Sequence, residues 1–330
     1  MPTPGTLIHP VVGNVLRYAA VDDPVDMARV ALPWEHHYRQ ITPDPFFGFL
    51  GQLQTPRFQL SRVTFGRGLL LHGDTPPGAW VFAVFDDDVV HFRGRQLGRT
   101  GLACLRHGED IDLYMQGTGR AWVLGLAEAD AERWVHSITG RGPSKLRDID
   151  RMVARDPVAA RAVRDTWRSE FERWRSAPAG LLDPEAQHDA AQRLLRGMLE
   201  QVDLPQVHLN ARDRYRILRR ANRYLDRRLG EPVSIADLCR ATGAAERTLH
   251  HVFHRQYGLP PMAYLKQLRL NRAREEMQSA RSSDNVTQIA LRCGFSHLGR
   301  FAADYRRLFG ELPSQALRQV RPDGGGLRPG

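Results

Sequence analysis

One pattern occurs twice and decides the fold, in LCRATGAAERTLHHVFHRQYGLPP (residues 238–261) and in IALRCGFSHLGRFAADYRRLFGELP (residues 289–313). In both stretches a glycine follows a short apolar run, and two apolar residues four positions apart then precede a second glycine and a proline. The four later matched positions recur 52 residues apart: Leu249 with Phe301, Phe253 with Tyr305, Gly258 with Gly310, and Pro261 with Pro313. Glycine gives the backbone freedom that a sharp turn between helices needs. The repeat therefore predicts two tandem helix-turn-helix units, which is typical of DNA-binding proteins.

The helices around this repeat can be placed from apolar spacing and from cap residues. In the first unit we expect helices over 235–242 and 246–257, with Gly243 at the turn and Ser234 as the N-cap. In the second unit we expect helices over 285–292 and 297–309, with the turn at Gly294. A long amphipathic helix over 260–280 would join the two units, and a basic helix over 212–229 would precede them.

The second helix of such a unit enters the major groove with its early turns. Burial of the apolar residues turns several long polar side chains outward, and arginine can present a bidentate fork to guanine while histidine can bond a base edge. The candidate base-reading residues are Arg247, His250, His251, His297 and Arg300. Contacts to phosphate position a protein without specifying sequence. The candidate phosphate contacts are Arg255, Arg306 and Arg307.

The charge of the chain is unevenly distributed. Residues 212–320 contain 21 Lys and Arg against 10 Asp and Glu, whereas residues 1–211 contain 24 against 26. A basic segment joined to a nearly neutral one indicates a polyanionic partner for the C-terminal part only. Along the 260–280 helix, Lys266, Arg269, Arg272 and Arg274 could contact phosphate or could form local ion pairs, and the sequence does not decide between these interpretations.

The N-terminal half has a different pattern of apolar residues and turn signals. Between residues 46 and 126, short apolar runs alternate with turn signals at close spacing, which favours an antiparallel sandwich or a small barrel. Helical patterns over 157–175 and 184–202 follow, and these helices either cap the barrel or form a dimer seam. We therefore predict an α+β protein with three parts: a sensing and dimerisation domain at 1–203, an all-α DNA-binding domain at 212–320, and a flexible tail at 321–330.

Several classes of protein are disfavoured. No apolar run approaches the ~20 residues that cross a bilayer, and the N-terminus lacks a secretory signal, so we expect a cytoplasmic protein. The cysteines Cys104, Cys239 and Cys293 are too few and too scattered for a disulfide framework or a cysteine-rich metal site. The spacing of His250, His251 and His254, with no nearby cysteine or carboxylate partner, disfavours a metal site there. We expect no enzyme activity, no catalytic residues, no metal and no cofactor.

The C-terminal segment resembles the AraC family of bacterial transcription regulators. The resemblance lies in RTLHHVFHRQYGLPPMAYLKQLRLNRAREEM (247–277) and IALRCGFSHLGRFAADYRRLFGELPSQALR (289–318). A sparser similarity, in YRQITPDPFFGFLGQLQTPRFQLSR (38–62), is to the ethanolamine-utilisation type of regulator and its relatives in amine catabolism. The resemblance implies a cupin-like sensor barrel and control of a neighbouring catabolic operon.

These inferences lead to a functional hypothesis. We expect an effector-responsive, sequence-specific activator that binds double-stranded DNA as a homodimer and works with RNA polymerase. The effector would occupy a pocket in the barrel, with aromatic walls and an arginine anchor drawn from Trp80, Phe82, Phe85, Arg57 and Arg62. The alternative is a constitutive architectural DNA-binding protein whose barrel serves only for dimerisation.

Overall fold

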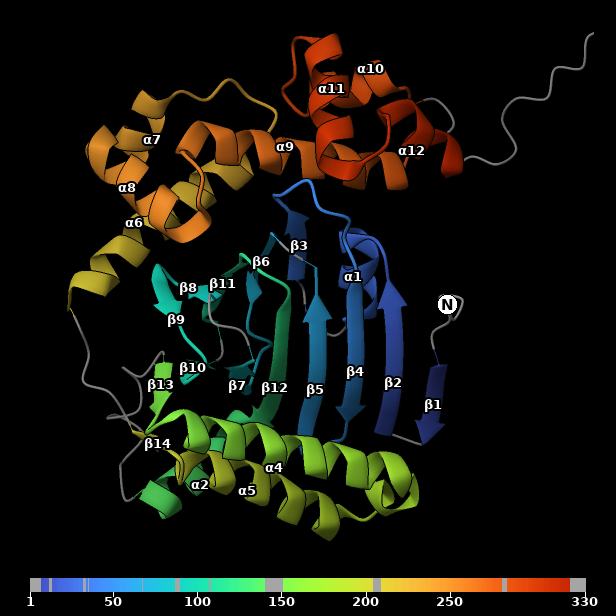
Figure 1. Cartoon of the computed structure of the whole chain (residues 1–330), viewed down its shortest axis with the longest axis vertical. Coiled ribbons are helices and arrows are strands. Elements are labelled where there is room, and N and C mark those ends of the chain that lie inside the picture. Colours follow the sequence, from blue (N-terminus) through green and yellow to red (C-terminus); the bar gives the residue numbers. More distant parts are fainter. Residues whose placement is uncertain are drawn as a thin grey trace, which may run out of the picture. The chain divides into compact units, whose positions relative to one another are not determined.

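The computed structural model of the protein describes residues 7–11, 14–31, 34, 36–66, 68–86, 90–106, 108–139, 151–203, 209–280 and 284–320. It divides the chain into two compact units, one rich in strands and one helical (Figure 1). The first unit consists of Met1–Tyr38 and Phe46–Leu209, and the second of Arg39–Pro45 and Asn210–Gly330. A short segment from the N-terminal half therefore belongs to the helical unit. The predicted tail, 321–330, lies outside the described residues.

The described strands of the first unit form two sheets rather than one closed barrel. The larger sheet has the order β1-β2-β4-β5-β12-β7-β10-β13-β14, and the smaller has the order β3-β6-β11-β8-β9. The bounds are β1 Leu7–Val11, β2 Asn14–Val21, β3 His36–Gln40, β4 Gly48–Gln54, β5 Phe58–Phe65, β6 Leu69–Asp74, β7 Ala79–Phe85, β8 Val90–Phe92, β9 Arg95–Leu97, β10 Gly101–Leu105, β11 Asp110–Met115, β12 Gly119–Ala127, β13 Arg151–Ala154 and β14 Val202–Asp203. The sheet-rich N-terminal part of the predicted α+β fold is confirmed.

Alternate residues of a strand point to opposite faces of a sheet, and this separates the first unit into two apolar layers. On β7, Trp80 and Phe82 lie in one cluster, together with residues of the covering helices. Phe85, on the other face of β7, lies in a second cluster that also contains residues of the smaller sheet. The second layer is the one that contains the cavity described below.

Helices cover the first of these layers. They are α2 Glu128–Thr139, α4 Pro157–Ser176 and α5 Pro184–Leu199, with the 3-10 turn Pro178–Leu182 between α4 and α5. The short helix α1, Pro24–Val30, packs in the second layer. Figure 1 shows α4 and α5 side by side. Trp167 of α4 is fully buried, and its Nε1 donates a hydrogen bond to the Leu194 carbonyl of α5 at 3.1 Å. The apolar face of α4 is thus occupied within the unit, which favours the capping interpretation of these helices over the dimer seam.

The second unit is helical. Its helices are α6 Leu209–Arg227, α7 Ile235–Thr242, α8 Glu246–Tyr257, α9 Pro261–Gln278, α10 Val286–Arg292, α11 Leu298–Phe309 and α12 Pro313–Gln319. We call α7 and α8 the first helix pair, and α10 and α11 the second helix pair. The long helix α9 connects the two pairs.

Aromatic side chains at the repeated positions form the core of the helical unit. Leu249 and Phe253 of α8 are completely buried, and Phe301 and Tyr305 of α11 are at most 1% exposed. The Tyr257 ring stacks on Tyr264 at the start of α9, with the ring centroids 4.3 Å apart. Burial of these residues fixes the rotation of α8 and α11 about their axes, and so determines which side chains face outward.

Candidate nucleic-acid interface and ligand cavity

The first helix pair is formed by strong local signals. The Ser234 hydroxyl accepts a hydrogen bond from the Asp237 backbone, and the Asp237 carboxylate accepts one from the Ser234 backbone at 2.8 Å, which closes a capping box. The hydrogen bonds from Ser234 hold the pKa of Asp237 below its ordinary value. Gly243 ends α7 with φ +71°, a left-handed conformation that side chains other than glycine rarely adopt. The turn therefore begins at Gly243, the glycine of the repeated pattern, where the backbone conformation also favours glycine.

The outward face of α8 carries the predicted reading residues. Arg247, His250, His251 and Arg255 are all exposed. Glu246 lies 3.8 Å from the His250 ring, so the prediction that these histidines lack a neighbouring carboxylate is wrong, because the two residues are one helical turn apart. His254 is exposed as well, so the helix presents two guanidinium groups and three imidazoles to solvent from its first three turns.

The second helix pair repeats this arrangement. Asn285 and Gln288 form a capping box at the start of α10, and Gly294 makes the turn with φ +80°. His297 is the N-cap of α11, and it is exposed together with Arg300 and Arg306. Arg307 is also exposed, but its Nη2 donates to Asp304 at 2.9 Å. His297, Arg300 and Arg306 thus face solvent and, among the described residues, lack the local carboxylate that Arg307 has.

The basic residues along α9 have partners inside the helical unit. Lys266 Nζ lies 3.2 Å from an Asp304 oxygen of α11, and Arg274 Nη1 donates to Glu311 at 2.8 Å. Arg272 Nε donates at 3.0 Å to Glu276 on its own helix. Local pairing thus favours the ion-pair interpretation of this helix over the phosphate-contact interpretation.

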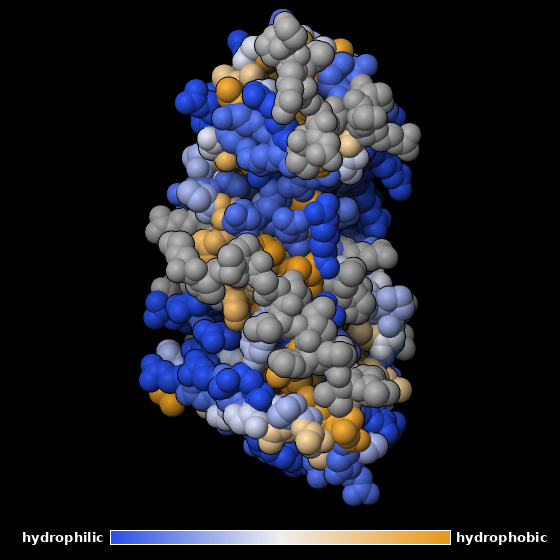
Figure 2. Space-filling view, turned by 90° about the vertical axis from the view of Figure 1, so that its right-hand side faces the viewer, coloured by the Kyte–Doolittle hydropathy of each residue, from blue (hydrophilic) through white to orange (hydrophobic). Residues whose placement is uncertain are grey.

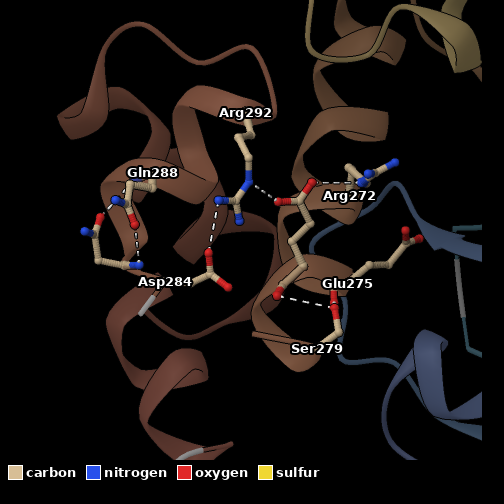
Figure 3. Close-up of polar contacts among 8 residues, drawn as sticks. Arg272, Glu275, Ser279, Asp284, Gln288 and Arg292 are labelled. Carbon is tan, nitrogen blue, oxygen red and sulfur yellow. Dashed lines mark hydrogen bonds and ion pairs between the residues drawn. The ribbon is translucent and has the colours of Figure 1, made fainter. Parts of the chain in front are cut away.

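The end of α9 is joined to α10 by the same kind of contact. Glu276 accepts hydrogen bonds from Arg272 and, at 2.9 Å, from Arg292 Nε of α10. Figure 3 shows the Arg292 guanidinium also reaching Asp284, to which its Nη1 donates at 3.0 Å. These hydrogen bonds raise the pKa of Arg292 above its ordinary value. The network fixes the second helix pair to the connecting helix.

Arg269 joins the two halves of the helical unit. Its Nε donates to the Leu229 carbonyl at 2.8 Å, its Nη1 donates to the Gly294 carbonyl at 3.2 Å, and its Nη2 donates to the Glu231 carbonyl. Burial lowers the pKa of Arg269. One guanidinium therefore connects the chain that follows α6 to the turn of the second helix pair, and it is not free to contact DNA.

The surface of the helical unit has the polarity that a nucleic-acid interface requires. In the view of Figure 2, hydrophilic residues predominate on the visible surface of the helical unit. The exposed apolar side chains on this unit include Leu291 and Leu298. Leu298 is the first residue of α11, where an apolar group can contact a thymine methyl. Sequence reasoning did not single out Leu298, because a lone leucine in an amphipathic helix normally indicates the core.

The first unit contains a cavity of about 90 Å³ between its two sheets, several times the ~10–15 Å³ that one water molecule needs. Its wall is largely apolar and includes no Asp, Glu, Lys or Arg among the described residues. The polar lining residues are His36, Tyr38, Gln52, Gln59 and Ser61. Within the described part of the chain, His36 Nε2 and Gln52 Oε1 are buried without a hydrogen-bond partner. Such unpaired atoms are costly unless a ligand or a water satisfies them.

The structure places the predicted pocket residues mostly elsewhere. Phe85 lines the cavity, whereas Trp80 and Phe82 point to the opposite face of β7 and pack against the helices. Arg57 lies 3.5 Å from Asp130, and Arg62 lies over the Trp122 ring at 6.0 Å. Neither arginine lines the cavity, so its polar groups are the neutral ones named above.

Burial lowers the pKa of His36 to about 3, with a smaller contribution from neighbouring His37. The unfolded chain therefore takes up this proton first, and the free energy of unfolding should fall as pH drops below about 6.5. We expect a loss of about 1–2 kcal/mol between pH 7 and pH 5, measured by urea denaturation. The loss should disappear in His36→Gln and persist in His37→Gln, and an identical pH profile for both variants would contradict the assignment.

Other kinds of site are missing from the described ranges. No group of three or more metal-ligating side chains occurs among the described residues. The three cysteines are free, and burial raises the pKa of the Cys293 thiol to about 12, so it is unreactive at neutral pH. No described helix is both long and apolar enough to span a bilayer.

Comparison with known proteins identifies the helical part. Residues 238–319 match the family model of a helix-turn-helix domain. The chain is 40% identical over 105 residues to a protein described as the probable thc operon regulatory protein of Rhodococcus erythropolis, covering 32% of each. It is 33% identical over 105 residues to the XylDLEGF operon transcriptional activator of Pseudomonas putida, covering 32% of this chain and 33% of the activator. The match thus spans about a third of the length of these curated relatives.

A solved structure is similar to about a third of this chain. A probable AraC family transcriptional regulator from Rhodopseudomonas palustris is 39% identical, with 32% of this chain covering 98% of that chain and a TM-score of 0.31. These relatives are regulators of transcription, not enzymes. The C-terminal part of this chain belongs to the AraC family of transcription regulators.

Proposed function

We propose that the protein is a sequence-specific transcription regulator that binds double-stranded DNA through two tandem helix-turn-helix units. The observation that carries this proposal is that α8 and α11 each end a capped helix pair, bury their repeated apolar residues and expose basic side chains. The two reading helices would enter successive major grooves, about 34 Å apart along the duplex. Residues 212–320 would form the DNA-binding domain.

Within this interface, the exposed residues divide into two roles. Arg247, His250 and His251 on α8, and His297 and Arg300 on α11, would contact base edges because they lie on the early turns. Arg255, Arg306 and Arg307 lie later on the same helices and would contact phosphate. The Asp304 carboxylate beside Arg307 partly neutralises that guanidinium, so Arg255 and Arg306 are the stronger phosphate candidates.

Salt dependence tests the DNA-binding proposal. Binding of the full chain to a duplex selected from random DNA should weaken linearly on a log–log plot against salt, with a slope of about −0.9 per phosphate contacted. Arg306→Ala should weaken binding to cognate and random duplexes alike and reduce the slope by about 1. Arg318→Ala, an exposed arginine on α12, is the matched control, and salt-independent binding would contradict the proposal.

We further propose that the first unit, residues 1–203, is a cupin-like sensor domain whose effector occupies the cavity between the sheets. A cavity without charged groups disfavours ions, because burying an unpaired charge is costly. The effector would be a small, mostly apolar and uncharged molecule, with one polar group that bonds to His36 Nε2 and Gln52 Oε1. A protonated amine would lack a carboxylate there, so the similarity to amine-catabolism regulators supports the control of a catabolic operon and not an ammonium effector.

Thermal melting of the full chain tests the sensor. We expect small aromatic or aliphatic alcohols to raise the melting temperature of the first unit. At a ligand concentration of ten times Kd, the free energy of unfolding should increase by about 1.4 kcal/mol. Carboxylates and ammonium compounds with the same carbon skeleton serve as controls and should have no effect. Enlarging a small lining residue, as in Ala103→Leu, should abolish the response. Flat curves for every neutral compound would favour the architectural alternative, in which the first unit serves only for assembly.

The remaining parts of the proposal concern partners. The relatives named above include an operon activator, which supports activation of a catabolic operon with RNA polymerase as a partner. We also propose that the protein works as a homodimer in the cytoplasm. The internal repeat provides two reading helices per chain, so a dimer would present four and bind a longer operator.

A further inference from the structure

The segment Arg39–Pro45 follows strand residues of the first unit in sequence, but it packs as part of the helical unit. Its second residue, Gln40, is only 3% exposed. The Gln40 backbone nitrogen donates to Asn271 Oδ1 at 3.0 Å, and Asn271 Nδ2 donates back to the Gln40 carbonyl at 2.8 Å. Asn271 is itself 3% exposed on α9. The amide side chain of Asn271 thus pairs with the main chain of Gln40 in the way that a neighbouring strand would.

The side chain of Gln40 reaches a second helix. Its Nε2 donates to the Leu308 carbonyl at 2.9 Å, near the C-terminal end of α11. The last four carbonyls of a helix lack partners within it, so this bond satisfies a group that α11 leaves open. The carbonyl oxygens of Thr42 and Asp44 lie 2.7 and 2.5 Å from the same Nε2, so its two hydrogens are shared among three carbonyls and hold the segment in a tight loop.

A third helix is contacted by the neighbouring residue. Arg39 Nη1 lies 3.1 Å from Asp226 Oδ1 on α6, and the Arg39 side chain is 9% exposed. The segment thus contacts α6, which precedes the first helix pair, α9, which connects the pairs, and α11 of the second pair. Ile41, 4% exposed, buries its side chain in the same stretch.

The residues just before this segment line the cavity of the first unit. His36 and Tyr38 are both lining residues, and the His36 ring nitrogen Nδ1 lies 3.4 Å from the Tyr38 hydroxyl. Only one peptide bond separates Tyr38 from Arg39. A change at the cavity wall that shifts the end of β3 would therefore reach Gln40 through the covalent chain.

We propose that Arg39–Pro45 is a regulatory clamp, which transmits occupation of the cavity to the placement of α11 relative to α6 and α9. This inference rests on the proposed DNA-binding function and adds the route of its regulation. Gln40 and Asn271 are positioning residues, since they would act on DNA only through the helices that they hold. An effector can alter DNA affinity only if it favours one of two arrangements of the protein, and the clamp provides an element that can be closed or open.

A double-mutant cycle in the full chain tests the clamp. Ala83→Leu, which fills the cavity with a side chain of the protein itself, serves as the probe in place of a ligand. It should change the affinity for the selected duplex by at least fivefold, the lower end of ordinary allosteric coupling. In a Gln40→Ala or Asn271→Leu background, the same substitution should change the affinity by less than twofold. Asp44→Asn, an exposed change within the segment, should leave the effect of Ala83→Leu intact.

The outcomes distinguish a failure of the proposed DNA-binding function from a failure of the clamp. If the wild-type chain binds no DNA duplex, the proposed function fails. If it binds, but Ala83→Leu and a second cavity-filling variant, Ala103→Leu, either leave the affinity unchanged or act equally with and without Gln40, the clamp is overturned. Melting curves identify variants that fail to fold. If Ala83→Leu does not fold, Ala103→Leu takes its place in the cycle.

Discussion

Arg269→Met is expected to lower the free energy of unfolding of the helical unit by about 3 kcal/mol. The reason is that methionine keeps much of the length of the side chain but leaves three carbonyls, of Leu229, Glu231 and Gly294, without their donor. Each orphaned and partly buried carbonyl costs about 1–3 kcal/mol, with the lower end appropriate where solvent can reach it. Urea denaturation followed by far-UV circular dichroism measures the loss.

The junction around Arg269 has little room to adjust. A Cβ added at Gly230 would lie 2.4 Å from the Arg292 carbonyl oxygen, and one at Gly294 would lie 3.0 Å from the Leu229 carbonyl oxygen. Arg272→Met is the matched control, because Arg272 is half exposed and pairs with Glu276 on its own helix. Its removal should cost only about 0.3–0.5 kcal/mol. Equal losses for the two variants would mean that Arg269 acts as a surface charge and not as the connection between the helix pairs.

Local signals allowed much of the helical unit to be predicted. The expected helices 235–242 and 246–257 coincide with α7 and α8, because a cap residue and a left-handed glycine mark their ends. The predicted outward residues of α8 and α11 are exposed for the same reason, since the buried residues four positions apart fix the helical face. Helix α12 was not predicted, because it begins at Pro313, where the repeated pattern ends.

The cavity could not be located in this way. Strand β7 reads AWVFAVF and is apolar on both faces, so its alternation has no polar side to indicate which residues face which layer. Trp80 and Phe82 are the larger side chains and were chosen for that reason, yet they pack under the helices. The neutral groups His36 and Gln52 come from strands β3 and β4, and only the pairing of the sheets brings them to one wall.

The clamp was equally inaccessible from sequence. Gln40 and Asn271 are separated by 231 residues, and no pattern in the sequence pairs them. The basic residues of α9 present the same difficulty, because Asp304 and Glu311 become their partners only after α11 folds against α9. Pairings of this kind depend on tertiary contacts, whereas periodicity reports only on neighbours within one element.

Arg247→Ala is expected to cost about 1–3 kcal/mol on cognate DNA and to abolish the preference at one base position. Arg247 is the second residue of α8, in the first turn that enters the groove, and its guanidinium is exposed without a local carboxylate partner among the described residues. Bidentate hydrogen bonds to guanine O6 and N7 are the contact that this geometry favours. Loss of such a contact removes discrimination as well as affinity, because every base then meets the same methyl group.

A cycle between protein and base substitutions measures this effect directly. Competition binding with duplexes changed at each position should show one base pair whose replacement no longer matters once Arg247 is alanine. Arg240→Ala is the control, since Arg240 is exposed on α7 and pairs with Asp237. A uniform loss across all duplexes would assign Arg247 to phosphate, and base reading by α8 would then depend on His250 and His251. If Arg247→Ala abolishes discrimination at one base pair and leaves the salt slope unchanged, Arg247 reads a base, in contrast to the phosphate role expected of Arg306.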